Sequence, residues 1–373
     1  MRLYLVVLPA ISLAMICLPA ATRADEVEQV RLRGSSVYTT PTYPIRSSEP
    51  SYPELAPPAY PAMGGPARSR PIAPTGPAAQ LHDFTFEFGT RFWYSTGKLA
   101  KDLYDDPRSS QNLNSRLTYA GLTSATFEGF GRADTSFGSF LKGYAGFSGL
   151  HSGTLNDEDF PPGLTAYSNT VSQQQGGKLG YGTIDFGQTL VTRERVRAGL
   201  FVGYGYLNEN VNAYGCDQVA GNPFVCVPTI GAGVLGISEE SHWQFARLGL
   251  LGEFKLLDCL KLSAEVAWLP YTQLSAQDTH WLRLGTGLFD ISGPIPESGG
   301  GTGVQLEAIM SYRVSDKVSV GLGGRYWYMQ THGGADFEKV IVGFPVAPAA
   351  QPLNFSTSRY GAFAQGGYKF GPI

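Results

Sequence analysis

The sequence has 373 residues, with 28 Lys or Arg, 31 Asp or Glu and a formal net charge of −3 at pH 7. This balance excludes the strongly basic surface that nucleic-acid binding requires. Only 16% of the residues are charged, whereas the chain has 47 Gly, 20 Tyr and 21 Phe. That bias is typical of outer-membrane β-barrels, whose strands alternate between a lipid face and a polar lumen and carry aromatic residues at both interfaces.

Residues 1–24 predict a secretory signal peptide. Arg2 is followed by an apolar run from Leu3 to Leu18 and then by small residues up to Ala24, which is the order of charge, apolar core and cleavage site in such peptides. The rest of the chain has no apolar stretch long enough for a membrane-spanning helix. We therefore expect an exported protein without a helical anchor.

Residues 25–81 form a segment rich in Pro, Ser, Ala and Tyr that has almost no periodic apolar pattern. Such a segment cannot bury enough apolar surface to fold alone. We predict a disordered or polyproline-like arm in the periplasm. One role for such an arm is to bind peptidoglycan or a periplasmic partner.

From residue 82 to residue 373 the pattern changes to an alternation of apolar and polar residues. Between Lys261 and Trp268, for example, the odd positions are mostly polar and the even positions apolar, as in a strand with one face in lipid. Segments of this kind lie at residues 82–98, 114–131, 136–155, 177–192, 195–211, 241–256, 259–275, 303–314, 317–331 and 356–370. Long connections alternate with short ones, and the long ones lie at about residues 99–113, 156–176, 212–240, 276–302 and 332–355. We predict an all-β fold, a ten-stranded antiparallel up-and-down transmembrane β-barrel with short periplasmic turns and long extracellular loops.

Three cysteines remain after removal of the signal peptide. Cys216 and Cys226 lie in one predicted loop, and Cys259 lies in a short turn. Because the exported compartment is oxidising, we expect a disulfide between Cys216 and Cys226. No histidine is spaced to complete a set of metal ligands, so neither a metal site nor a cofactor is predicted.

Two acidic motifs follow strand-like segments on the same rim of the predicted barrel. Asp157 and Asp159, in LNDEDF, begin the second long loop, and Asp278 and His280, in AQDTHW, begin the fourth. The two strands are nearly opposite each other around the ring. A histidine that is oriented by one carboxylate and faces a second carboxylate pair can hold and activate a water molecule.

A simpler interpretation of these acids is that they are solvated, as most acidic residues on a barrel rim are. Strict alternation counted from Phe147 and from Trp268 also places all four side chains on the outer face of the barrel. One β-bulge in each strand would turn them inward, and bulges are common at barrel rims and active sites. The hydrolytic hypothesis therefore requires two bulges.

From about residue 84 to residue 370 the sequence resembles the omptins, the ten-stranded outer-membrane proteases of Gram-negative bacteria. The resemblance rests on segments such as FEFGTRFWYSTGK, RAGLFVGYGY and GAFAQGGYKF in this order, and above all on LNDEDF and AQDTHW in the matching loops. It implies an aspartic-type endopeptidase of the cell outer membrane that acts on peptides or proteins at the cell surface. In that reaction His280 is the general base, Asp278 orients it, and Asp157 and Asp159 position the attacking water without a covalent acyl-enzyme.

The resemblance also places substrate-binding and lipid-binding positions. Omptins carry two acidic residues that bind a basic side chain before the cleaved bond, and these fall here near Lys101, which Asp102 adjoins, and at Ala276. We therefore expect weaker selection for Arg or Lys than an omptin shows. The basic residues with which omptins hold lipopolysaccharide on the outer wall correspond approximately to Tyr204, Tyr206, Asn208 and His242.

Two other functions are compatible with the sequence. A non-catalytic outer-membrane barrel of the same fold could serve as an adhesin or a structural protein. A porin is a weaker alternative, because about ten strands enclose a lumen that side chains largely fill.

Overall fold

The computed structural model describes residues 84–105, 112–161, 166–284, 293–337 and 350–371. The chain divides into two compact units, Met1–Ala79 and Gln80–Ile373. The predicted signal peptide, residues 1–24, and the predicted Pro-rich arm, residues 25–81, lie outside the described residues. Among the described residues, no helix is both long and apolar enough to cross a membrane.

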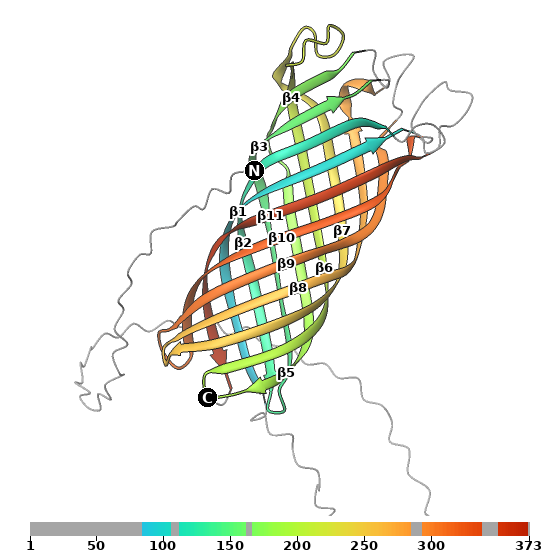
Figure 1. The fold of residues 1–373 in the computed structure, drawn as a ribbon. Coiled ribbons are helices and arrows are strands. Elements are labelled where there is room, and N and C mark those ends of the chain that lie inside the picture. Colours follow the sequence, from blue (N-terminus) through green and yellow to red (C-terminus); the bar gives the residue numbers. More distant parts are fainter. Residues whose placement is uncertain (1–83, 106–111, 162–165, 285–292, 338–349, 372–373) are drawn as a thin grey trace, which may run out of the picture. The chain divides into compact units, whose positions relative to one another are not determined.

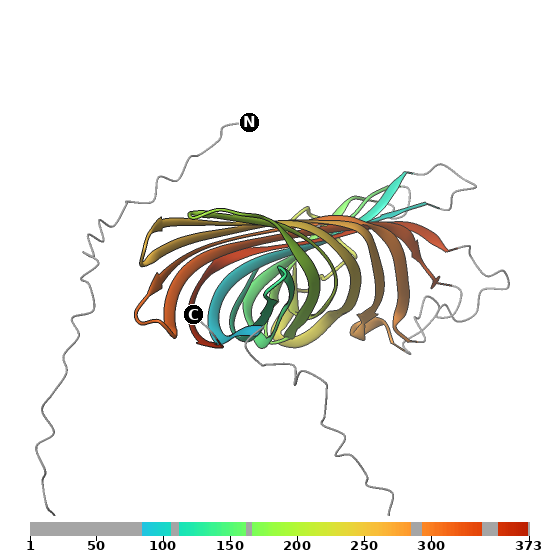
Figure 2. The same ribbon diagram turned by 90° about the horizontal axis from the view of Figure 1, so that it is seen from below.

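The described part of the second unit is built from antiparallel strands that wrap into a barrel (Figures 1 and 2). The strands are β1 (Phe84–Tyr104), β2 (Leu113–Thr135), β3 (Ser139–Asp159), β4 (Ser168–Gln174), β5 (Lys178–Thr192), β6 (Val196–Gln218), β7 (Ile230–Leu257), β8 (Leu260–His280), β9 (Ile295–Arg313), β10 (Val318–Ala335) and β11 (Gln351–Phe370). Pairing of β1 with β11 and of β2 with β3 closes the ring. A short 3-10 helix, η2 (Trp281–Arg283), follows β8.

The described residues contain eleven strands, whereas the sequence predicted ten. The additional strand is β4, which was predicted as part of a loop. Both β4 and β5 pair with β3 on one side and with β6 on the other. They therefore occupy the same place in the ring, one after the other, and Gly176 and Gly177, both with positive φ, connect them.

The outer face of the barrel carries a belt of exposed apolar and aromatic side chains. Exposed tyrosines mark the upper edge of this belt on several strands, and they are Tyr94, Tyr206, Tyr271, Tyr326 and Tyr360. The strands continue well past these residues, for example from Tyr271 to His280 on β8. At about 3.3 Å per residue, this extension is about 30 Å long. The upper strand ends therefore lie beyond the belt.

The two bulges that the hydrolytic hypothesis requires are present. On β8, Leu269 pairs with Gly303 of β9 and Thr272 pairs with Gly301, so β8 has one more residue than β9 between these two pairs. The same insertion is seen against β7. On β3, the register shifts by one residue between Leu150 and Ser152 relative to β2. Each bulge reverses which positions face the lumen, because side chains alternate along a strand.

Side chains fill much of the lumen of the described barrel. Trp93, Tyr119 and Trp243 are completely buried inside it. Lower in the lumen, Arg325 donates to Glu128 at 2.6 Å in a buried ion pair. This packing does not favour a porin, whose lumen is water-filled. The predicted disulfide between Cys216 and Cys226 is confirmed, and it ties the end of β6 to the following loop.

Candidate active site

The four residues predicted to be catalytic lie at the upper ends of two strands. Asp157 and Asp159 end β3, and Asp278 and His280 end β8, whereas the sequence had suggested that they begin loops. β3 and β8 are not neighbours in the sheet. All four side chains nevertheless line one cavity of about 800 Å³, because the bulges turn both strand ends inward.

Asp278 and His280 form the pair that the D-x-H spacing predicted. Nε2 of His280 lies 3.1 Å from Oδ2 of Asp278, and their side chains are 19% and 2% exposed. If Nε2 carries the proton that is donated to Asp278, Nδ1 keeps the lone pair that can accept a proton. A buried carboxylate that fixes the imidazole in this way is the usual partner of a general base.

On the other strand, one carboxylate oxygen of Asp157 is left open to a ligand by the described residues. Oδ1 of Asp157 is buried and has no hydrogen-bond partner among the described residues. Burial, followed by the negative charge of Asp159, raises the pKa of Asp157 to about 7. Burial likewise raises the pKa of Asp159. The two carboxylates can therefore accept hydrogen bonds from a water molecule, and Asp157 binds a proton more readily than an ordinary aspartate.

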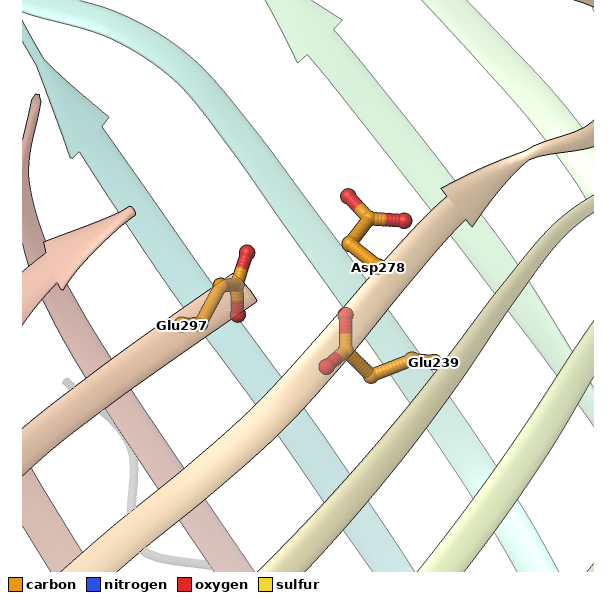
Figure 3. A group of neighbouring side chains, drawn as sticks. All are labelled: Glu239, Asp278 and Glu297. Atoms are coloured by element: carbon orange, nitrogen blue, oxygen red, sulfur yellow. The ribbon is translucent and has the colours of Figure 1, made fainter. Parts of the chain in front are cut away.

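Beneath Asp278 lies a buried cation, Lys101. Its Nζ lies 2.6 Å from Glu239, 2.7 Å from Asp278 and 2.9 Å from Glu297. The three carboxylates project from the neighbouring strands β7, β8 and β9 into a common space (Figure 3). Lys101 reaches them from β1, which is paired with none of these strands.

The three carboxylates have an arrangement that could also hold a metal ion. One oxygen from each of Glu239, Asp278 and Glu297 lies within 4.8 Å of the others, and oxygen ligands of this kind suit hard divalent cations. In this chain, however, the ammonium of Lys101 is the cation that these oxygens contact. We therefore assign the charge balance of the cluster to Lys101.

Lys101 also sets the protonation of the Asp–His pair. Burial alone would raise the pKa of Asp278, but the Lys101 ammonium and then His280 hold it well below its usual range. Burial alone would lower the pKa of His280, but the charge of Asp278 and the hydrogen bond to it raise that pKa above its ordinary value. Asp278 thus stays ionised, and His280 has increased basicity.

Glu239 and Glu297 were not recognised from the sequence. Both fall in stretches that were predicted as long loops, at residues 212–240 and 276–302. In the structure they face the lumen from β7 and β9, where Glu239 is opposite Asp278 and Glu297 is opposite Ala276. Continuing the two-residue period beyond the apolar belt would have placed them inside the barrel.

The predicted substrate-binding residues lie on different faces. Lys101 and Ala276 are buried inside the barrel. Asp102 lies on the opposite face of β1 from Lys101 and receives two hydrogen bonds from Arg116, at 2.7 and 2.8 Å. Asp102, the third residue predicted to bind substrate, therefore points away from the lumen that Lys101 faces, because successive side chains of a strand point to opposite faces.

The four positions predicted for lipopolysaccharide lie together on β6 and β7. Nδ1 of His242 lies 2.8 Å from the hydroxyl of Tyr206 and 2.9 Å from Nδ2 of Asn208. Tyr204 is nearby on β6 and is half exposed. These side chains are polar, but His242 is the only ionisable cation among the four.

Comparison with known proteins places the fold. No family model matches the chain, and no curated protein matches its sequence. Among solved structures, the outer-membrane protease OmpT from Escherichia coli is similar with a TM-score of 0.59 and 14% identity, covering 77% of this chain and 97% of OmpT. The Pseudomonas putida toluene transporter TodX also matches, with a TM-score of 0.25 and 11% identity, covering 77% of this chain and 89% of TodX. The attachment invasion locus protein Ail of Yersinia pestis matches with a TM-score of 0.22 and 8% identity, covering 76% of this chain and 98% of Ail. The likeness to OmpT shows that the fold is that of an outer-membrane β-barrel.

Proposed function

We propose that this protein is an omptin-like endopeptidase of the outer membrane, which hydrolyses peptide bonds of peptides or proteins at the cell surface. The observation that carries the proposal is the meeting of Asp157, Asp159, Asp278 and His280 in one cavity, together with the 3.1 Å contact between His280 and Asp278. These residues come from distant parts of the chain, and two bulges are needed to bring them together.

The geometry supports a reaction without a covalent intermediate. Asp157 and Asp159 hold a water molecule, and Nδ1 of His280 takes a proton from it as the oxygen attacks the peptide carbonyl. Asp278 stabilises the imidazolium that forms, and its own charge is maintained by Lys101. The imidazolium then gives its proton to the departing amine, so the base is regenerated.

A second candidate is a non-catalytic barrel that acts as an adhesin. It is favoured by the exposed apolar tip of the β6–β7 connection, where Val219, Phe224 and Val227 are all largely exposed. Exposed apolar groups away from the lipid belt are typical of surfaces that bind other proteins. This function requires no chemistry in the cavity.

The test is cleavage of a peptide library by outer membranes that contain the full-length protein. His280→Ala should abolish cleavage, and Asp157→Asn and Asp278→Asn should each reduce it by a factor on the order of 100 or more, the scale of positioned acid–base groups. His332→Ala is the matched control, because His332 is exposed on β10 and contacts Asn354. It should cleave like the wild type.

Two outcomes would count against the enzyme. Cleavage that persists unchanged in a folded His280→Ala protein would rule out this mechanism. Absence of cleavage by the wild type, with or without added lipopolysaccharide, would favour the adhesin. Heat-modifiable migration on gels reports in every case whether the barrel is folded.

A further inference from the structure

We infer that this site cleaves bonds next to an apolar side chain and not next to a basic one. The inference rests on the proposed function and names its substrate class. It follows from which side chains stand beside the reactive groups and from which charges a substrate can reach.

Three of the four proposed catalytic residues have an apolar residue directly opposite them on a neighbouring strand. Leu117 is directly opposite Asp157, Ile237 is opposite His280, and Ile295 is opposite Asp278. Residues directly opposite in antiparallel strands carry their side chains on the same face, with Cβ atoms about 5 Å apart. All three apolar side chains line the same cavity as the four polar ones.

Two further apolar residues extend this wall. Leu103 belongs to the buried apolar cluster and Phe337 packs against it, and both line the cavity. A substrate side chain beside the reacting carbonyl would therefore contact Leu, Ile and Phe carbons. Burying such a side chain gains free energy only if it is apolar.

Two nearby carboxylates that could otherwise attract a basic side chain, Glu239 and Glu297, are not accessible from the cavity. The side chains of Glu239 and Glu297 are 0% and 1% exposed, and both contact the ammonium of Lys101. Neither residue lines the cavity. A substrate guanidinium or ammonium would have to displace Lys101 to reach them.

A positive charge that lines the cavity also disfavours a basic substrate side chain. Arg283, in η2, lines the cavity and is close enough to influence both Asp159 and His280 electrostatically. It opposes the approach of a second cation. Of the carboxylates that line the cavity, Asp157 and Asp159 are assigned to the water, and Asp278 contacts Lys101 and His280.

The experiment uses defined peptides that differ at one position next to the cleaved bond. Wild-type protein in outer membranes should cleave the Leu, Ile or Phe peptides with a kcat/KM at least about tenfold above that of the Arg and Lys peptides, since a methylene or two in an apolar pocket is worth roughly 10- to 200-fold. His280→Ala should cleave none of them.

A substitution in the apolar wall of the cavity tests whether these side chains select the substrate. Ile295→Ala should lower kcat/KM for the Leu peptide by about tenfold or more and change that for an Ala peptide much less. Ile309→Ala is the matched control, because Ile309 is on the same strand and lines a different cavity. It should leave all rates unchanged, and Ile295→Val provides a milder change should Ile295→Ala fail to fold.

The outcomes separate this inference from the proposed function. Cleavage that depends on His280 but is directed to Arg or Lys would overturn the inference and leave the endopeptidase in place. Equal effects of Ile295→Ala on Leu and Ala peptides would also overturn it. Loss of His280 dependence, or no cleavage at all, would overturn both.

Discussion

Lys101 is the residue on which the charge balance of the site depends. It is completely buried, and the carboxylates of Glu239, Asp278 and Glu297 surround its Nζ. Removing one partner from a buried ion pair is costly because the other charges stay in a medium of low polarity. The ammonium therefore both stabilises the upper barrel and keeps Asp278 ionised.

We expect Lys101→Met to destabilise the barrel by about 3–5 kcal/mol, the usual cost of leaving buried charge unpaired, and to reduce cleavage. Lys369→Met is the control, because Lys369 is 42% exposed and lies 3.6 Å from Glu87. Exposed pairs contribute at most about 1 kcal/mol. Thermal unfolding in detergent measures both variants, and equal unfolding temperatures for the two would contradict the role given to Lys101.

Activity should rise with pH through and above neutrality. Asp157, with its pKa raised to about 7, holds water best when ionised. His280 must be neutral to accept a proton, and its pKa is raised above the ordinary value. Both groups lose their protons as the pH rises, so both titrations increase the rate.

The variant Asp278→Asn should shift this pH profile. The Asp278 carboxylate raises the pKa of His280, so its removal lets the imidazole lose its proton at lower pH. The remaining activity should reach its plateau at a lower pH than in the wild type. Measuring kcat/KM from about pH 5 to about pH 9 covers the range in which histidine titrates. An unshifted profile would mean that another group controls the rise.

At the scale of elements, the sequence predicted the lower barrel well and the upper strand ends poorly. In the belt, outward residues such as Trp268 and Phe147 are apolar, so alternation marks the strand. Above the belt both faces carry polar residues, as in Ser168–Gln174 with the sequence SNTVSQQ. Such strands resemble loops in sequence, and this is why β4, Glu239 and Glu297 were missed.

The bulge in β8 is the element-scale feature that the site needs most. Deleting Gln273, which lies one residue above the bulge, should cancel the effect of the inserted residue and turn Asp278 and His280 to the outer face, because a one-residue shift reverses every later side chain. We expect at least a hundredfold loss of cleavage, on the scale of losing positioned groups, and a lower unfolding temperature. Tyr271→Phe keeps the bulge and should retain activity. Undiminished cleavage after the deletion would show that the bulge does not aim these residues.

At the scale of the whole molecule, the Pro-rich segment and the barrel should behave independently. Residues 25–81 lack the apolar periodicity that folding requires. Deleting them behind an intact signal peptide should preserve both heat-modifiable migration and cleavage. If the folded band disappeared, the segment would be part of the barrel's stability and not an arm that binds a periplasmic partner.

Because the strands extend past the exposed tyrosines, the height of the proposed active site limits which substrates can reach it. With about 30 Å of strand tilted by about 40°, His280 lies roughly 20 Å above the level of Tyr271. A neighbouring membrane protein whose loops barely emerge from the lipid cannot present a bond at that height. Flexible chains arriving from solution can, and so can tall ectodomains. The height of His280 above the lipid thus selects among substrates before the site recognises any substrate side chain.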